Sequence, residues 1–428
     1  MKLVENPQND VWLNLLERPT ATVDDIETTV TEIFKDIQQH GDTAVLKYTD
    51  VFDGVKLNSM LVSSEEIKTA QNNVSSKLKE AILLAKKNIN RFHEAQKTQK
   101  IEIETKTGVL CWQEKRAIQK IGLYIPGGTA PLFSTVLMLA VPAKIAGCEE
   151  IILCSPPNKS GKIADEILYT ADLCGVTKIF KVGGIQAIAA MTFGTETINP
   201  VYKIYGPGNQ FVTVAKQLAT KFGVAIDMPA GPSELLVVAD DTAVPKYVAA
   251  DLLSQAEHGS DSQVILVSTS KKLINEVMKE ITIQMAQLPR KSIAKKAIAN
   301  SKAILVSNYQ EALRFINAYA PEHFIVCTEN DIFFTEGIQN AGSVFIGNYT
   351  PESAGDYASG TNHTLPTNGF SKSYSGVNLD SFSKAITFQK ITETGLLNIG
   401  SAIEIMAEAE GLQAHKNAVS IRLKDLQS

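Results

Sequence analysis

The strongest constraint on the fold is an alternation of short apolar segments with helical segments along the middle of the chain. Apolar runs at 121–125, 150–154, 178–182 and 201–205 are each followed by a segment of helical periodicity, and the pattern resumes from 235 to 319. Strands that alternate with helices at this spacing are typical of a parallel sheet with helices on both faces. The sequence therefore predicts an α/β protein with two doubly wound, Rossmann-like halves.

Other patterns flank this alternation. Residues 24–97 are charged and helical, whereas 101–110 alternate with a period of two around a turn. The second pattern predicts an antiparallel hairpin. After about residue 370 the alternation weakens, and a helix is expected near 400–410. This helical terminal extension is a candidate for packing on another subunit.

The composition excludes several classes of protein. A chain of 428 residues that is 44% hydrophobic and 20% charged, with a formal charge of −5, is typical of a soluble protein of two or three domains. We expect no nucleic-acid partner, because no basic run is present. We expect a cytoplasmic protein with no membrane contact, because no signal peptide or spanning segment is visible. The five cysteines include no C-x-x-C motif, which favours reduced thiols.

Glycine-containing turns follow three of the predicted strands. They are Tyr124-Ile-Pro-Gly-Gly128, Val182-Gly-Gly-Ile-Gln186 and Tyr205-Gly-Pro-Gly-Asn-Gln210. Such turns let backbone approach a ligand, and the helix start that follows favours an anion. They indicate a phosphate-bearing ligand, although none matches a G-x-G-x-x-G or Walker motif. Tyr124, Gln186 and Asn209 could contact a nucleotide; equally, Tyr124 could be a core aromatic and Asn209 a helix N-cap.

Four of the six histidines lie beside acids or amides in segments punctuated by Gly, Ser and Pro. These segments are 254–259, 320–324, 352–363 and 410–415. Imidazole is the usual metal ligand and the usual proton carrier near neutral pH. We therefore predict that these segments build one site.

Metal-ligand chemistry can be assigned to three of these segments. Gln255 and His258 are three residues apart at the end of a predicted helix, so they share a face. Asp356 and His363 flank a small polar loop, where binding residues concentrate. With His415, the set Gln255, His258 and Asp356 offers two nitrogens and two oxygens, which suits Zn²⁺. The alternatives are a polar helix end and, for 410–415, a frayed C-terminus.

Glu322 and His323 follow Pro321 at the start of a predicted apolar strand. Their chemistry suits a water activator and a base. Because adjacent strand residues point to opposite faces, they would act from different directions unless the backbone bends. A solvated strand edge is the alternative.

These motifs resemble those of the histidinol dehydrogenases from about residue 20 to the end of the chain. The motifs that carry the resemblance are the glycine turns, Asp227-Met-Pro-Ala-Gly-Pro-Ser-Glu234, Leu253-Ser-Gln-Ala-Glu-His-Gly259, Pro321-Glu-His323, the 352–363 segment and Ala414-His-Lys-Asn-Ala418. The resemblance implies an aldehyde/histidinol dehydrogenase-like fold. It also implies a zinc-containing homodimer that oxidises L-histidinol to L-histidine in two NAD-dependent steps.

The resemblance also implies a role for each matching residue. The zinc ligands, which also meet the substrate, would be Gln255, His258, Asp356 and His415. Glu322 and His323 would be the acid–base pair, with His323 also touching substrate. Tyr124, Gln186 and Asn209 would contact NAD, and Ser233, His363 and Glu410 would complete the substrate pocket. Glu410 and His415 would come from the partner subunit.

The expected division of the chain follows from the same comparison. Residues 1–24 would form an N-terminal extension, and 25–105 with 234–377 the Rossmann-like domain that carries most zinc-binding and catalytic residues. Residues 106–233 would form the NAD-contacting domain, and 378–428 the extension that reaches the partner.

Three other functions fit parts of the sequence. An aldehyde dehydrogenase would need a cysteine nucleophile, for which Cys154 is the first candidate and Cys111 the second, although a buried hydrophobic thiol is the simpler interpretation. A zinc hydrolase would use the glutamate and a metal-bound water, but the chain has no H-E-x-x-H motif. A non-catalytic amine- or imidazole-binding protein would bind ligand without reducing NAD.

Overall fold

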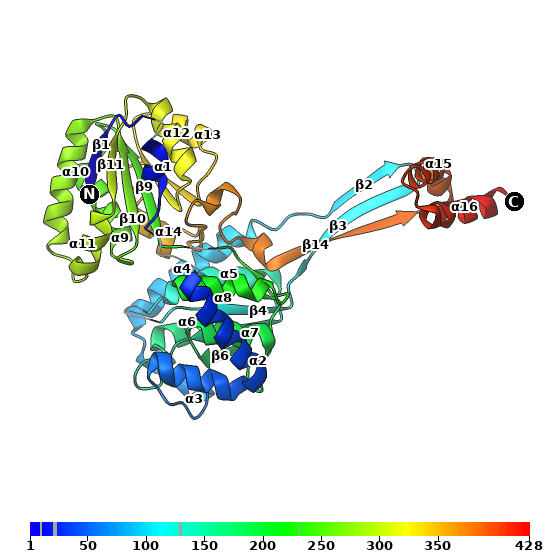
Figure 1. Ribbon diagram of the computed structural model, residues 1–428, viewed down its shortest axis with the longest axis horizontal. Coiled ribbons are helices and arrows are strands. Elements are labelled where there is room, and N and C mark those ends of the chain that lie inside the picture. Colours follow the sequence, from blue (N-terminus) through cyan, green and yellow to red (C-terminus); the bar gives the residue numbers. More distant parts are fainter. Residues whose placement is uncertain (9–10, 20–23, 128–130, 230) are drawn as a thin grey trace. The chain divides into compact units, whose positions relative to one another are not determined.

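The computed structural model describes residues 1–8, 11–19, 24–127, 131–229 and 231–428 (Figure 1). The chain divides into two units. The first comprises Met1–Gln96 and Ile118–Ser381, and the second comprises Lys97–Ala117 and Phe382–Ser428. Among the described helices, none combines the length and the apolar character that crossing a membrane requires.

One half of the first unit is a five-stranded parallel sheet of order β6-β5-β4-β7-β8. Its strands are β4 (Lys120–Tyr124), β5 (Glu150–Ser155), β6 (Lys178–Lys181), β7 (Lys203–Tyr205) and β8 (Ala225–Ile226). The first four confirm the predicted strands. The strand order reverses between β4 and β7, and open α/β sheets bind ligands outside the carboxyl ends of their strands at such a point.

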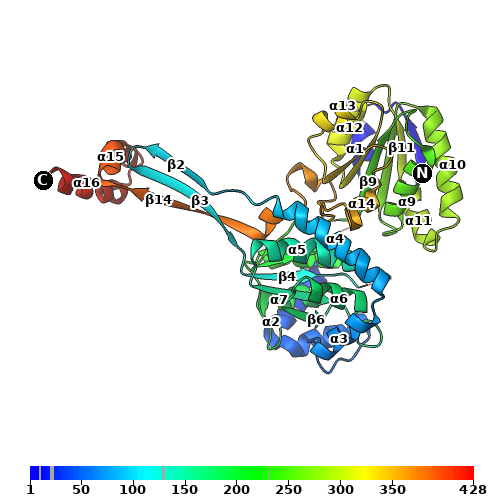
Figure 2. The ribbon, with the colours of Figure 1, turned by 180° about the vertical axis from the view of Figure 1, so that it is seen from behind.

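Two sets of helices belong to this half. The connecting helices are α5 (Phe133–Ala146), α6 (Asp165–Leu173), α7 (Gly184–Phe193) and α8 (Gln210–Thr220). Three helices from the N-terminal region contact them: α2 (Asp24–Asp53), α3 (Ser64–Asn73) and α4 (Ser76–Glu94). α2 contacts α7 and α8, α3 contacts α6, and α4 contacts α5 (Figure 2). Phe34 of α2 shares a buried core with Phe180 and Ile188.

The other half of the first unit is a six-stranded parallel sheet of order β1-β11-β10-β9-β12-β13. Its strands are β1 (Lys2–Glu5), β9 (Glu234–Ala239), β10 (Gln263–Ser268), β11 (Lys302–Leu305), β12 (His323–Cys327) and β13 (Ser343–Ile346). Leu235 and Val237 belong to one buried core, and Leu236 and Val238 to another. Because successive strand side chains point to opposite faces, both faces of this sheet are covered. The doubly wound fold is confirmed.

Helices form both of these cores. α9 (Pro245–Ala256), α10 (Lys271–Met285) and α11 (Lys291–Ala299) pack into one. α1 (Trp12–Leu16), α12 (Tyr309–Tyr319) and α13 (Asp331–Gly337) pack into the other.

The second unit is a three-stranded antiparallel sheet with two helices. Its elements are β2 (Ile101–Lys106), β3 (Val109–Ala117), β14 (Ser383–Ile391), α15 (Glu393–Ala409) and α16 (Gln413–Gln427). The strand order is β14-β3-β2, and β2 and β3 form the predicted hairpin. The predicted terminal helix is α15. The chain then bends at Gly411, whose φ is +71°, and continues as α16 rather than as a frayed tail.

The structure corrects the predicted domain boundaries. Residues 25–105 were assigned to the half that contains 234–377, but α2, α3 and α4 contact helices of the other sheet. Residues 101–117 join the C-terminal elements in the second unit. The N-terminal residues are not a separate extension, because β1 pairs with β11. Contacts between segments far apart in the sequence decide these assignments, and local periodicity carries no information about such contacts.

Candidate active site

A cavity of about 360 Å³ in the first unit collects most of the predicted site residues. Eight of them line it: Asn209, Ser233, Gln255, His258, Glu322, His323, Asp356 and His363. The turns after β4 and β7 reach the cavity at the carboxyl edge of the five-stranded sheet. Ser233 and Glu322 lie directly before β9 and β12, at the amino edge of the six-stranded sheet. The rule that ligands bind at carboxyl ends therefore describes only one of the two sheets.

Glu322 and His323 act from the same side. The chain leaves α12 through Ala320, whose left-handed backbone has a φ of +55°, and Glu322 precedes the first residue of β12. The alternation of strand side chains therefore does not separate the pair. A Glu322 Oε2 lies 3.6 Å from His323 Nδ1 and accepts the backbone N–H of Glu234 at 2.8 Å. The condition under which the two residues can face the same side, a bend of the backbone, is therefore met.

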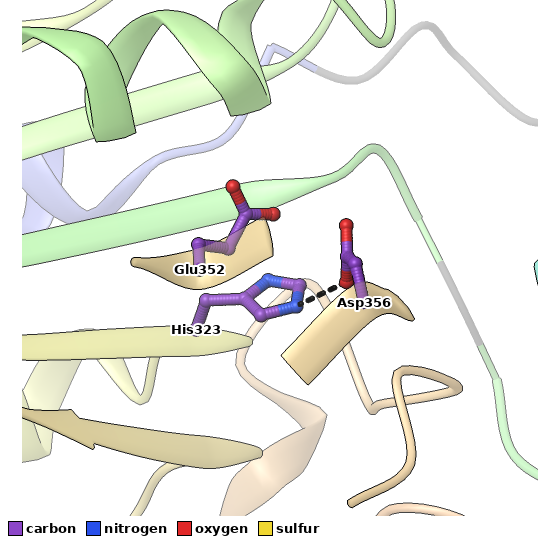
Figure 3. Close-up of side chains that lie close together, drawn as sticks. All are labelled: His323, Glu352 and Asp356. Atoms are coloured by element: carbon purple, nitrogen blue, oxygen red, sulfur yellow. Dashed lines mark ion pairs between the residues drawn. The ribbon is translucent and has the colours of Figure 1, made fainter. Parts of the chain in front are cut away.

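His323 is poised to exchange a proton on one defined nitrogen. Its Nδ1 lies 3.1 Å from the carbonyl oxygen of Glu234, to which it can donate. Its Nε2 is buried and has no hydrogen-bond partner among the described residues. The Nε2 atom instead lies 3.8 Å from Asp356 Oδ1 (Figure 3). In the neutral ring, Nε2 is therefore the basic atom.

Three carboxylates surround this ring. Burial by itself would lower the pKa of His323, but the charge of Glu322 and its hydrogen bond, with the charges of Glu352 and Asp356, raise that pKa to about 10. Burial raises the pKa of Glu352 to about 8, and the nearby His323 opposes this shift. Both shifts keep a proton in this cluster near neutral pH, on His323 and on Glu352, and a bound cation would compete with these protons.

Asp356 lies on a short helix rather than in an irregular loop, which corrects the predicted structure of this segment. α14 spans Glu352–Tyr357, and His363 follows it. His363 Nδ1 lies 2.9 Å from the backbone oxygen of Asp356, and Nε2 lies 3.1 Å from the Thr135 hydroxyl. Both ring nitrogens therefore have partners, and burial lowers the pKa of His363. A neutral ring with fixed contacts suits a pocket residue better than a base.

Two of the four predicted zinc ligands come from the end of α9 and a third from α14. Gln255 is fully buried on the last turn of α9, and the exposed His258 lies just past it. Together with Asp356 they line the same cavity and offer amide oxygen, imidazole nitrogen and carboxylate oxygen. His323, Glu352 and Asp356 form a second possible donor group, whose ligand atoms lie within 4.8 Å of one another. This donor chemistry fits a borderline divalent cation such as Zn²⁺.

The predicted nucleotide contacts fall into two places. Tyr124 and Gln186 are buried near Asp53 and are not among the residues that line the cavity. The Tyr124 hydroxyl accepts the backbone N–H of Gly184 at 3.2 Å, and Gln186 Nε2 donates to Asp53 Oδ2 at 3.3 Å. Asn209 caps α8, because its Oδ1 accepts the N–H of Val212 at 3.1 Å, and it also lines the cavity. Its N-cap interpretation is confirmed.

The three turns need glycine mainly because each of them packs closely against a neighbouring residue. A Cβ at Gly127 or Gly183 would lie 2.2 or 2.3 Å from the ring of Pro156, which sits between these two turns. At Gly206 it would lie 2.0 Å from the carbonyl oxygen of Tyr124. Gly128 of the first turn lies outside the described residues. The glycines therefore allow the turns to pack closely at one sheet edge.

Glu410 and His415 belong to the second unit, at the end of α15 and in the first turn of α16. Both side chains are exposed. The other predicted zinc and substrate residues all belong to the first unit. The predicted set of zinc and substrate residues is therefore distributed over both units of the fold.

Several polar residues at the site were not given roles from the sequence. Glu352 was visible as the first residue of the 352–363 motif, but its burial was not. Buried Glu234 forms an ion pair with Arg18, at 2.9 Å, and its backbone contacts both Glu322 and His323. Asp53 gave no signal, since it ends a long helix far away in sequence. Such roles depend on tertiary contacts.

The cysteine alternative loses its candidate nucleophile. Cys154 is fully buried, and burial raises the pKa of its thiol well above the usual range. A thiol that stays protonated and inaccessible is a poor nucleophile. Cys111, the second candidate, lies on β3 of the second unit.

Comparison with known proteins points to one family. The family model for histidinol dehydrogenase matches residues 16–423. The histidinol dehydrogenase of Bacteroides thetaiotaomicron is 59% identical over 426 residues, with 100% of both chains covered. That of Haemophilus influenzae is 53% identical, with 98% of this chain and 99% of the relative covered. The crystal structure of histidinol dehydrogenase from Elizabethkingia anophelis superposes with a TM-score of 0.98 at 56% identity, covering 100% of this chain and 99% of that one.

Proposed function

The chain belongs to the histidinol dehydrogenase family of NAD-dependent oxidoreductases, and on this premise we propose that it is a zinc-dependent homodimeric enzyme of histidine biosynthesis. It oxidises L-histidinol to L-histidine through the aldehyde, with two NAD molecules as hydride acceptors. One observation carries the proposal: the basic Nε2 of His323 opens toward Asp356 in a cavity that also contains Glu322 and the donor groups of Gln255 and His258.

His323 serves the first oxidation. As hydride leaves the alcohol carbon for NAD, the hydroxyl proton passes to His323 Nε2, and the aldehyde forms. The contact from Nδ1 to the carbonyl oxygen of Glu234 fixes the ring while this proton moves. General-base assistance of this kind typically contributes ~10²–10⁴ in rate.

Glu322 serves the second oxidation. The aldehyde must gain water before a second hydride can leave, and a carboxylate can take the proton of that water as its oxygen attacks the carbonyl carbon. The backbone N–H of Glu234 holds one oxygen of Glu322, so that the group has a fixed position. The second hydride then passes to the second NAD, and the acid is formed.

The metal would be held by Gln255, His258, Asp356 and, from the partner subunit, the residue equivalent to His415. When bound, Zn²⁺ would fix the amino and imidazole nitrogens of the substrate and lower the pKa of His323 by offsetting part of the surrounding negative charge. Ser233, His363 and Glu410 would complete the substrate pocket. The buried carboxylates around His323 support this assignment, because a cation could replace the protons that they hold on the imidazole and on Glu352.

NAD would bind at the carboxyl edge of the five-stranded sheet. The order reversal between β4 and β7 supports this position, as do the turns that follow these strands. Tyr124, Gln186 and Asn209 would contact the cofactor. Gln186 Oε1 is buried and has no partner among the described residues, which leaves an acceptor free for it.

The second unit supports the homodimer. It exposes many large apolar side chains on its strands and helices, namely those of Ile101, Ile103, Ile386, Ile391, Leu397, Ile405, Met406, Leu412 and Ile421. A unit this small cannot bury such side chains in a core of its own. A partner subunit would cover them and would bring Glu410 and His415 to the other chain's cavity.

The protein is expected to work in the cytoplasm. All five cysteines are in the thiol form, as in proteins that function in a reducing compartment.

The decisive assay measures NADH absorbance after mixing the purified enzyme with histidinol and NAD, with and without prior removal of metal by EDTA. We expect two NADH per histidinol, loss of turnover after EDTA treatment and recovery on adding Zn²⁺. Zinc-dependent binding of histidinol with no NADH formed would instead identify a non-catalytic binding protein. Full activity after verified metal removal would refute the zinc assignment.

A further inference from the structure

Glu352 is a buried carboxylate in the candidate site to which the proposed mechanism gives no task. Its side chain is 1% exposed, and it begins the same short helix, α14, that carries Asp356. The two residues are four apart and therefore share a face of that helix. Figure 3 shows both beside His323.

Both oxygens of Glu352 are already in use. Oε2 accepts the hydroxyl of Ser254 at 2.5 Å, and Oε1 accepts the amide nitrogen of Gln255 at the same distance. In this orientation the amide oxygen of Gln255 lies 3.2 Å from the backbone nitrogen of Glu234 and shares its N–H with Glu322 Oε2, which lies 2.8 Å from the same nitrogen. The opposite orientation would let the amide nitrogen donate to Glu322 Oε2 at 3.4 Å and to the Glu234 carbonyl oxygen at 3.5 Å, but it would set the amide oxygen against the Glu352 carboxylate at 2.5 Å. The short contact with Glu352 therefore favours the first orientation.

The contact is anchored from α9. The Asp251 carboxylate accepts the backbone N–H of Glu352. Asp251, Ser254 and Gln255 have the spacing of one face of α9, so a single helix face holds the first residue of α14. The end of α9 that carries Gln255 is thereby tied to the helix that carries Asp356.

This arrangement matters because a glutamine amide is ambiguous as a metal ligand. Its oxygen can bind a cation, whereas its N–H₂ group repels one, and the two ends have the same shape. A carboxylate accepts hydrogen bonds only, and it therefore fixes which end of the amide faces it. An amide oxygen with one hydrogen bond keeps a second lone pair for a metal.

We propose that Glu352 is a positioning residue for metal binding: it holds the nitrogen of Gln255 and thereby presents the amide oxygen to the cation. The inference rests on the proposed function, because it takes Gln255 as a ligand. It differs from a direct role for Glu352, which its place near His323 and Asp356 would otherwise suggest.

The test uses the full-length enzyme with Glu352→Gln, which preserves shape but offers an N–H₂ group as readily as an oxygen. We expect Zn²⁺ affinity, measured by competition with a chromophoric chelator, to fall about 10–100-fold, as for loss of other groups that orient metal ligands. The visible spectrum of the Co²⁺-loaded variant at saturation should match that of wild type, because the ligand set is the same. Unchanged affinity, or a saturated Co²⁺ spectrum that shows a lost ligand, would overturn the proposal.

Two further variants make the result specific. Ser254→Ala removes one support of Glu352 but leaves the Gln255 contact, so we expect Zn²⁺ affinity to fall by less than in Glu352→Gln. If Glu352→Gln does not fold, the Zn²⁺ affinity of Ser254→Ala tests the proposal in its place. Glu257→Gln removes an equal charge near His258 and serves as the control. If Zn²⁺ affinity fell as much in Glu257→Gln as in Glu352→Gln, the loss of charge alone would explain both results, and the positioning role of Glu352 would be refuted. A wild-type enzyme that binds no Zn²⁺ would refute the proposed function itself, and this role with it.

Discussion

At the scale of single residues, the site depends on backbone groups as much as on side chains. The amide N–H of Glu234 fixes Glu322, and its carbonyl oxygen fixes His323. The proposed acid–base pair is therefore aligned by the first residue of β9. The ion pair between Arg18 and the Glu234 side chain holds that residue in turn, with Arg18 stacked 3.7 Å from the centroid of the Tyr319 ring.

Glu322→Gln should separate the two oxidations. The amide keeps an oxygen that can accept the N–H of Glu234, but it cannot take a proton from water. We expect oxidation of the aldehyde to slow by ~10²–10⁴, with less effect on the oxidation of histidinol to the aldehyde. Rapid-mixing kinetics with each compound would measure the two steps. Aldehyde oxidation at the wild-type rate would contradict the role given to Glu322.

Asp53→Asn should change the pH dependence of stability. Burial raises the pKa of Asp53 to about 6, although Lys159 opposes this shift, so the folded state favours the protonated acid. The stability that this preference contributes is present below the unfolded pKa and is lost as pH rises through about 6. The variant should therefore be more stable than wild type at pH ~7–8, by about 1–2 kcal/mol after allowance for partial exposure.

Urea unfolding of both proteins across this pH range would measure the effect. The difference in free energy of unfolding should shrink toward zero below pH ~3, where the wild-type acid is protonated in both the folded and the unfolded state. A difference that does not vary with pH would show that burial of the charge is not its cause.

At the scale of elements, the sequence predicts the secondary structure of each segment better than it predicts the role of that segment in the fold. The strand–helix alternation locates β4–β7 and β9–β11 almost to the residue, because buried parallel strands are continuous apolar runs. The glycine turns were also recognised. Their first physical role, however, is packing against Pro156 and the backbone of Tyr124, which requires knowing which strands are neighbours.

Gly206→Ala tests this packing. Gly206 has a φ of +126°, and an added Cβ would meet the carbonyl oxygen of Tyr124. We expect a loss of at least about 2–3 kcal/mol in the free energy of unfolding from backbone strain and the clash together. Gly223→Ala is the matched control, because Gly223 also has a positive φ, of +84°, but no atom within 4 Å of the new Cβ.

Urea denaturation of the two variants gives the comparison. Gly223→Ala should cost only about 1–2 kcal/mol, the penalty for a left-handed alanine. Equal losses at the two positions would mean that the close approach to Tyr124 contributes nothing.

At the scale of the whole molecule, the proposed sharing of sites between subunits can be tested by mixing inactive variants. In a dimer of one Glu322→Gln chain and one His415→Ala chain, one site would receive both defects and the other would receive neither. Random reassociation of equal amounts makes half of the dimers mixed, so about a quarter of all sites should regain activity. NADH formation after unfolding and refolding the variants together would measure the recovery. No recovery, with mixed dimers demonstrated, would place each site within one chain.

The sequence by itself determined the secondary structure of the middle of the chain, the α/β class and the chemistry of the site residues. Periodicity and residue type are local properties, and the chain carries them whatever its fold. Only the tertiary structure decided that α2–α4 pack against the helices of the five-stranded sheet and that Glu322 and His323 face one cavity. It also decided that both oxygens of Glu352 are occupied, by Ser254 and Gln255. These facts depend on contacts between segments far apart in sequence, for which no local pattern exists.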